Sequence, residues 1–236
     1  MNRSRRYIDD PNYFRLGYQL AALQLNAVLA GGDVRLDGRE VSRDELIEAS
    51  AVSAERVSVD AGDLLEQYER QTARRFRWSR LWFRAKLEPR EERLQRFLLE
   101  TVRPSAELVL AGALRERGDA VAADRIFESI RALASTGTLS YRSFYNLACY
   151  EASQGRNYSL DEQRDSFAVA LDDLRQALRR VHGRRRVEVV RWASEDPSFV
   201  SLREDPLFGG RFKDLLARYG PMPAIRSQRR PPWHRH

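Results

Sequence analysis

The feature that most constrains the fold is a regular alternation of helix start and stop signals. An Asp-Pro pair occurs at Asp10-Pro11, Asp196-Pro197 and Asp205-Pro206, and the first is followed by an apolar stretch that ends at Gly31-Gly32. Aspartate is a preferred N-cap, proline is favoured in the first turn, and glycine commonly ends a helix. This punctuation predicts an all-α protein.

The same signals predict the individual helices. We expect them over roughly 11–30, 42–51, 60–86, 89–101, 104–117, 120–134, 139–154 and 159–181, followed by two short pieces that begin at Pro197 and Pro206. Ser42 and Ser159 each precede a glutamate by three residues, which is the capping-box pattern. The stretch after Ala51 (VSAERVSVDAG) has no clear period and is predicted to be an ordered loop. The dipeptide Asp37-Gly38 permits a small β-hairpin near 34–41.

Two sets of apolar side chains are expected to turn inward. In the first helix an apolar face is predicted from residues three and four apart, namely Tyr13, Leu16, Leu20, Leu23 and Ala27. Phe199 and Phe208 follow their Asp-Pro pairs at the same offset and are expected to be buried.

The dipeptide Arg103-Pro104 is expected to break the chain between two helices.

Composition excludes several classes of function. The single cysteine among 236 residues allows no intrachain disulfide and no cysteine metal cluster, and two of the three histidines lie within the last three residues. The sequence has no glycine-rich phosphate loop, zinc-protease helix or nucleophile elbow. We therefore expect no enzyme activity, no catalytic or metal-binding residues, no cofactor and no small-molecule substrate.

The start of the chain bears on its location. The first residues, MNRSRRYIDDPNY, are charged, and the apolar stretch 16–30 is too short and too polar to span a bilayer of about 30 Å. No signal peptide is predicted, so the expected compartment is the cytoplasm.

The basic residues are 39 arginines and two lysines, a skew typical of a GC-rich bacterial genome.

The positive charge is concentrated near the end of the chain. Residues 179–236 carry 14 basic and 6 acidic residues, so they account for the whole net charge of +7. The candidate basic cluster is Arg179, Arg180, Arg184, Arg185 and Arg186. It could grip the phosphates of a nucleic acid or an acidic partner. Alternatively it is a solvated helix end, where arginine favours the negative end of the helix dipole. The final segment 220–236 is rich in proline and arginine and is expected to be a flexible basic tail.

A second basic segment, 74–86 (RRFRWSRLWFRAK), interleaves arginines with aromatic rings and could attach to a membrane surface. Its aromatics are spread around the helix rather than confined to one stripe, which favours burial. Residues 70–96 hold ten basic and three acidic residues, whereas residues 7–66 hold five and twelve. We therefore expect residues 7–66 to cover the 70–96 segment, at least in part.

The segment from 104 onward contains an internal helix-pair repeat. In ELVLAGALRERGDAVAADRIFESI the positions that match a repeat pattern are Leu110, Ala111, Leu114, Gly118, Ala123, Phe127 and Ile130. The next pair supplies Leu147, Ala148, Gly155, Ala170, Leu174 and Ala177, with Glu151 departing where tyrosine is usual. This pattern resembles the tetratricopeptide repeat superfamily over residues 104–181. The segment 192–216 is similar to the one that often caps bacterial members.

The resemblance implies a fold, a domain division and a function. It implies a tetratricopeptide-like α-solenoid over 102–219, with 1–101 as a helical region packed on the repeats. Small residues at helix contacts should include Ala111, Ala123, Ala148 and Ala170. The family implies a scaffold or adaptor that binds a peptide or protein partner on its concave face.

On the family's layout the partner-binding residues are Arg142, Tyr145, Asn146 and Cys149. Asn146 could then hydrogen-bond the backbone of a bound peptide. The alternative is that Asn146 only bridges neighbouring helices, Tyr145 is half-buried core and Cys149 is a small filler. A further alternative for the whole protein is nucleic-acid binding through 179–191 and the tail.

Overall fold

The computed structural model describes residues 11–31, 34–36, 39–79, 89–154 and 159–220. Within these ranges the chain is almost entirely helical, with one small two-stranded sheet, as the sequence predicts. The elements are α1 (Pro11–Ala30), β1 (Val34–Leu36), β2 (Arg39–Val41), α2 (Arg43–Ser79), α3 (Pro89–Phe97), the π-helical turn η2 (Leu98–Val102), α4 (Arg103–Glu116), α5 (Ala120–Ser135), α6 (Tyr141–Gln154), α7 (Leu160–Arg180), α8 (Gly183–Glu195), the 3₁₀ turn η4 (Pro197–Phe199), α9 (Val200–Glu204) and α10 (Phe208–Tyr219).

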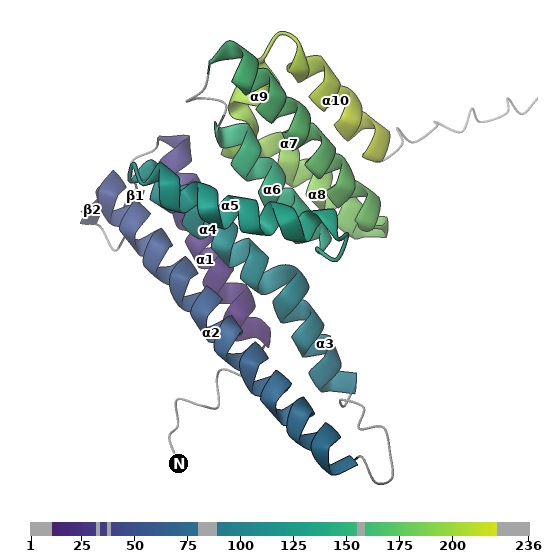
Figure 1. Cartoon of the computed structure of the whole chain (residues 1–236). Coiled ribbons are helices and arrows are strands. Elements are labelled where there is room, and N and C mark those ends of the chain that lie inside the picture. Colours follow the sequence, from purple (N-terminus) through teal and green to yellow (C-terminus); the bar gives the residue numbers. More distant parts are fainter. Residues whose placement is uncertain (1–10, 32–33, 37–38, 80–88, 155–158, 221–236) are drawn as a thin grey trace, which may run out of the picture.

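The helices form two groups that meet at α4 and α6. The long helix α2 runs along one side of the molecule with α1 and the α3–α4 run beside it (Figure 1). Helices α6 to α10 gather at the other end, with α5 lying across α4 (Figure 1). No helix among the described residues is both long enough and apolar enough to cross a membrane.

Two short strands pair on either side of the position where Asp37-Gly38 predicts a hairpin turn. Strands β1 and β2 pair in antiparallel register, with Val34 opposite Val41. The predicted capping box directly follows: the Glu45 backbone N–H donates to Ser42 Oγ over 3.2 Å, and the Ser42 N–H donates to Glu45 Oε2 over 2.9 Å. These two bonds satisfy donors that would otherwise be orphaned at the start of α2.

The predicted loop between residues 51 and 60 is wrong, because α2 is one uninterrupted helix through that stretch. Its buried residues lie three and four apart and are mostly small: Ala51, Ala54, Val57, Ala61 and Leu64. Small side chains let α1 approach closely, so a Cβ added to Gly17 would lie only 2.5 Å from Val57 Cγ2. Asp60 does not cap a new helix; it accepts a 2.6 Å hydrogen bond from the Tyr13 hydroxyl of α1.

The predicted apolar face of α1 is wrong at its three leucines, whereas Tyr13 and Ala27 are half-buried against the core. Leu16, Leu20 and Leu23 are exposed, with 66% of the Leu16 surface open to solvent. The buried residues are instead Phe14, Tyr18, Ala21, Leu25 and Val28, which form a second apolar series at helical spacing. Because α1 holds one charged residue in 20, both series satisfy the periodicity. The series with the aromatic rings and the small Ala21 fits against α2 and α4.

Arg103-Pro104 does not break the chain, contrary to the prediction. Helical backbone continues from Pro89 to Glu116, with the π-helical turn η2 directly before Pro104. The Arg103 N–H bonds back to Leu98 O, five residues earlier, in the manner of a π-helix. This run passes through the boundary expected between 1–101 and 102–219.

The helix pairs follow the sequence signals closely. Gly118 turns the chain between α4 and α5 with a φ of +89°, a conformation that favours glycine. Asp119 then caps α5 by accepting from the Ala122 N–H over 3.1 Å. The small residues predicted at helix contacts are all fully buried: Ala111, Ala123, Ala148 and Ala170. Helices α4 and α5, and α6 and α7, therefore pack as close pairs.

The C-terminal elements confirm the predicted start at Pro197, whereas α10 begins at Phe208 rather than at the predicted Pro206, and one further helix was not predicted. Asp196 accepts from the Ser198 N–H and Asp205 from the Phe208 N–H, each over 2.9 Å, and Phe199 and Phe208 are buried as predicted. The missed helix is α8, whose buried Val189 packs in the same core cluster as these phenylalanines.

Two predictions fall outside the described residues. One concerns the burial of the aromatic rings Phe76, Trp78, Trp82 and Phe83, and with it membrane attachment through 74–86. The other concerns the basic tail beyond Gly220.

Candidate functional site

A groove of about 610 Å³ lies between α1, α4, α6 and the segment that joins α8 to η4. Its apolar lining includes Leu23 and Leu29 from α1, Val109 from α4, and Trp192 from α8. The lining residues of the two helix pairs come from the first helix of each, α4 and α6, and none comes from α5 or α7.

All four residues predicted to face a partner line this groove: Arg142, Tyr145, Asn146 and Cys149. They fall three, one and three residues apart, so they share one face of α6. The opposite wall is α1, whose part in the site the sequence analysis missed. The helical periodicity of α1 gave no signal for it, because both apolar series of α1 have the same spacing.

Arg142 joins the two walls of the groove. Its Nη1 donates to the Tyr18 hydroxyl of α1 over 2.5 Å, and its Nε donates to the Tyr141 hydroxyl over 3.0 Å. Burial alone would lower the pKa of the Arg142 guanidinium, but the hydroxyl groups of Tyr141 and Tyr18 together raise it above the ordinary value. The guanidinium is therefore permanently charged and held in place.

Tyr145 and Cys149 both bind the carboxylate of Asp196, which also lines the groove. The Tyr145 hydroxyl donates to Asp196 Oδ2 over 2.9 Å, and the Cys149 thiol lies 3.7 Å from the same oxygen. Burial raises the pKa of both groups well above their ordinary values, and the Asp196 charge adds to the effect. Both remain protonated donors at neutral pH, so Cys149 lacks the thiolate that a nucleophile requires.

Amide side chains in the groove have unused hydrogen-bonding capacity. Asn146 is half-buried, and its side chain forms no hydrogen bond within the described part of the chain. Gln154 also lines the groove and is only 5% exposed, yet its Oε1 has no partner among the described residues. A buried acceptor without a donor costs about 1–3 kcal/mol. The Gln154 oxygen is itself shielded from solvent, so the amide that a ligand in the groove can bind is that of the half-buried Asn146.

The charge of the groove is acidic at the end formed by α8. Glu195 is exposed on the rim and Asp196 lies beside it. The other lining carboxylate, Glu116 at the end of α4, pairs with Arg43. Arg142 is the only lining cation among the described residues, and its donors are engaged by tyrosines.

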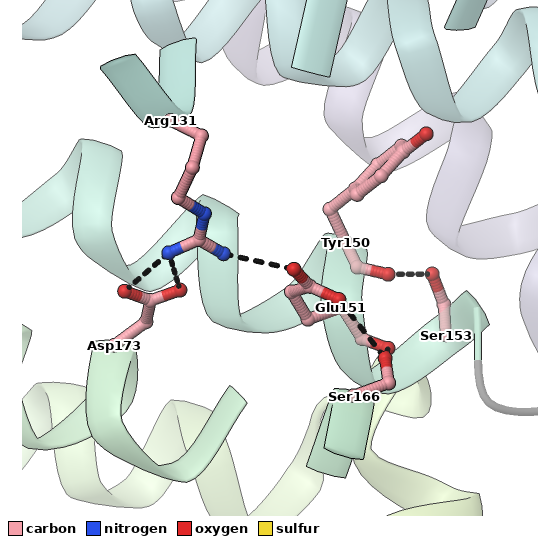
Figure 2. A network of polar contacts seen from close by, with 6 residues as sticks. All are labelled: Arg131, Tyr150, Glu151, Ser153, Ser166 and Asp173. Atoms are coloured by element: carbon pink, nitrogen blue, oxygen red, sulfur yellow. Dashed lines mark hydrogen bonds and ion pairs between the residues drawn. The ribbon is translucent and has the colours of Figure 1, made fainter. Parts of the chain in front are cut away.

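A network of polar contacts behind the groove fixes the position of α6 (Figure 2). Arg131 of α5 binds both carboxylate oxygens of Asp173 on α7, over 3.0 and 2.8 Å, and reaches Glu151 of α6 over 2.9 Å. The Ser166 hydroxyl of α7 lies within hydrogen-bonding distance of the Glu151 backbone and carboxylate oxygens, at 2.7 and 2.9 Å. Glu151, which departs from the repeat pattern, thus joins α6 to two other helices.

The network holds two carboxylates and one guanidinium, so it carries a net negative charge. Asp173 is only 4% exposed, and its burial raises its pKa from 3.8 to about 6, even though Arg131 acts in the opposite direction. The nearby charges of Glu151 and Asp172 add to the increase. Arg131 stabilises each carboxylate less than it would in an exclusive pair, because it serves both.

The predicted basic cluster is divided between the end of α7 and the first turn of α8. Arg180 lies 4.2 Å from the centroid of the Phe144 ring, and Arg186 Nε donates to Val181 O over 2.8 Å. Arg184 and Arg185 both pair with Glu188, at 3.6 and 3.4 Å. Arg179 is exposed. Several of these guanidinium groups therefore have partners within the fold and do not form one open patch of free charge.

Within the described ranges, no group of three or more His, Cys, Asp or Glu side chains could hold a metal ion. No protein-family model matches the chain, and neither does any curated protein or any solved structure.

Proposed function

We propose that this protein is a non-catalytic scaffold whose groove binds an extended peptide segment of basic and apolar character. One observation carries the proposal: the four α6 residues expected to face a partner line one groove, and among them the half-buried Asn146 amide forms no hydrogen bond within the described part of the chain. The proposal extends to fold, in that α4–α5 and α6–α7 would act as two tetratricopeptide-like repeats with the groove on their inner side.

The lining pattern supports the repeat interpretation. In such an array the first helix of each pair faces the ligand and the second faces outward. The groove takes its residues from α4 and α6 and none from α5 or α7. The fully buried Ala111 and Ala148 allow the close helix contacts that the array requires.

The side-chain chemistry supports a peptide as the ligand. An amide side chain offers both a donor and an acceptor, which is the pattern that a peptide backbone complements. Asn146 on one wall and Gln19 and Asn26 on the other place such groups on both sides of the groove. Leu23, Leu29 and Trp192 add apolar surface for the side chains of the peptide, worth about 25 cal/mol per Å² buried.

The charge of the rim supports a basic rather than an acidic peptide. Glu195 and Asp196 lie at one end, while Arg142 is occupied by tyrosine hydroxyls. An arginine of the peptide beside Glu195 would form a charge-assisted hydrogen bond, and an acidic peptide would be repelled.

The test is selection of phage-displayed random peptides on the immobilised full chain. We expect the recovered peptides to be rich in arginine and apolar residues and to lose at least tenfold in affinity for the Asn146→Ala, Glu195→Lys double variant. The matched control is Glu128→Lys, an exposed carboxylate of α5 outside the groove, which should leave affinity unchanged. Recovery of acidic peptides, or equal binding to the groove variant, would overturn the proposal.

A further inference from the structure

We infer that residues 221–236 of this same chain occupy the groove in the free protein and compete there with peptide ligands. The inference rests on the proposed function, because it gives the groove a ligand of the class argued above. It concerns the regulation of that site: a partner must displace the chain's own C-terminal segment to bind.

The segment begins beside one wall of the groove. Gly220, the last described residue, lies against α8, since a Cβ added there would be 3.8 Å from Val190 Cγ1. The neighbouring Val189 and Trp192 line the groove. The chain therefore leaves the folded part beside α8, one of the helices that line the groove.

The segment is long enough to reach the whole site. Its 16 residues span up to about 50 Å when extended, at about 3.3 Å per residue. Helix α8 has 13 residues and is about 20 Å long at 1.5 Å per residue. The segment can therefore pass the C-terminal end of α8 and still lay several residues along the groove.

The composition of the segment complements the groove. It contains Arg226, Arg229, Arg230 and Arg235 and no acidic residue, so its charge is opposite to that of Glu195 and Asp196. Trp233 and Ile225 supply apolar side chains for the leucine-lined wall. Its four prolines favour a polyproline-like backbone, a conformation without internal hydrogen bonds whose peptide groups can bind amide side chains such as Asn146.

Tethering makes even a weak contact effective. A ligand joined by a short flexible linker has an effective concentration on the order of millimolar. If the free segment binds with a dissociation constant of ~0.1 mM, the tethered segment occupies the groove about nine-tenths of the time. An external peptide should then bind the wild-type chain about tenfold more weakly than a chain whose segment is released.

The first experiment places a spin label in the segment of the full chain. Ser227→Cys is labelled in a Cys149→Ala background, and paramagnetic broadening is measured on the Trp192 indole and the Asn146 side-chain amide. Both signals should broaden, and replacing Arg226, Arg229 and Arg230 by Glu should restore them. The matched control is a label at Glu128→Cys on α5, outside the groove, in the same background.

The second experiment measures affinity for one peptide selected on the groove, with wild-type chain and with the variant that carries the three Arg→Glu changes. The variant should bind about tenfold more tightly.

If the peptide binds the groove but the label leaves Trp192 and Asn146 sharp, the proposed function stands and this inference is overturned. If the groove signals of isotope-labelled chains without a spin label broaden when spin-labelled chains are added, the occupant is a second copy and the inference also fails. If the label broadens the groove signals but no external peptide binds there, even to the variant with the three Arg→Glu changes, the segment occupies the groove but the proposed function and the competition both fail.

Discussion

The raised pKa of Asp173 gives the sharpest prediction about stability, through the variant Asp173→Asn. The variant keeps the shape of the side chain but removes the charge that burial penalises. It also leaves Arg131 paired with Glu151 alone, at 2.9 Å, so the network becomes neutral. The comparison with wild type therefore isolates the titration of one buried carboxyl group.

The sign and size of the effect follow from the linkage between proton binding and folding. The pKa of Asp173 is about 6 in the folded protein and close to 3.8 when the chain unfolds, so the folded state binds the proton more tightly. A difference of about two pH units corresponds to about 3 kcal/mol. This stabilisation is fully present below pH 3.8 and is lost as the pH rises through about 6. Wild type should therefore lose about 3 kcal/mol relative to Asp173→Asn between pH 3.5 and pH 7.

The assay is urea unfolding of both proteins followed by helical circular dichroism, at intervals between pH 3.5 and pH 7. The control is Asp165→Asn, which removes an exposed carboxylate from the same helix and should change the free energy of unfolding by no more than about 0.5 kcal/mol at every pH. A difference between wild type and Asp173→Asn that stays constant with pH would refute the reasoning. So would one in which wild type gains stability as the pH rises, because Arg131 would then hold the Asp173 pKa low.

Three further predictions concern packing. Ala148→Leu should overpack α6 against α7 and lower the free energy of unfolding by about 1–3 kcal/mol in urea titrations, because Ala148 is fully buried. Gly17→Ala should lower the thermal midpoint of unfolding, because the added Cβ would lie 2.5 Å from a valine methyl of α2. Gly62→Ala is the matched control, because a Cβ at Gly62 meets nothing within 4 Å, and it should stabilise α2 by about 0.5–1 kcal/mol. Arg180→Ala should lower the thermal midpoint, because it removes the contact of the guanidinium with the Phe144 ring of α6. The Arg184 side chain is 94% exposed, so Arg184→Ala should change the thermal midpoint little.

The helix ends were predictable because their signals are local. The Ser42 and Ser159 capping boxes and the Asp196-Pro197 pair each act within one turn of helix, so neighbouring residues are sufficient to define them. The burial of Ala111 and Ala148 was predictable for a related reason. A small residue repeated at helical spacing marks a close contact, whichever helix provides the other side.

The errors came from features that depend on distant segments. Nothing within 52–62 shows that α1 will pack on its alanines, and without that contact the stretch has little apolar surface of its own. The two apolar series of α1 are equivalent in sequence, and only the shapes of α2 and α4 select the one with Phe14 and Tyr18. Helix α8 was missed because a run of arginines hides the widely spaced Val189 and Ala193 that bury it.

The candidate site was half predictable for the same reason. The face of α6 that carries Arg142, Tyr145, Asn146 and Cys149 follows from the repeat pattern, which is a local property. The opposite wall follows from the packing of α1 against α4. Leu25 of α1 lies so close to Gly112 of α4 that a Cβ added to Gly112 would be 2.7 Å from a Leu25 methyl group. A groove requires both walls, so its depth and its acidic rim became evident only in three dimensions.

Pro104 shows how one residue can join two regions that local signals would separate. Proline has no N–H, so the carbonyl of Glu100, four residues earlier, loses its usual helical donor. That carbonyl instead accepts from the Ser140 N–H over 2.9 Å and from the Ser143 hydroxyl over 2.7 Å, both at the start of α6. The break expected at Pro104 therefore becomes a contact between the α3–α4 run and the helix that carries the candidate site. Ser143→Ala should leave Glu100 O with one donor and cost about 1 kcal/mol in urea unfolding. It should also shift the NMR signal of the Asn146 side chain one turn away, and an unchanged signal would show that α6 is held in place without this contact.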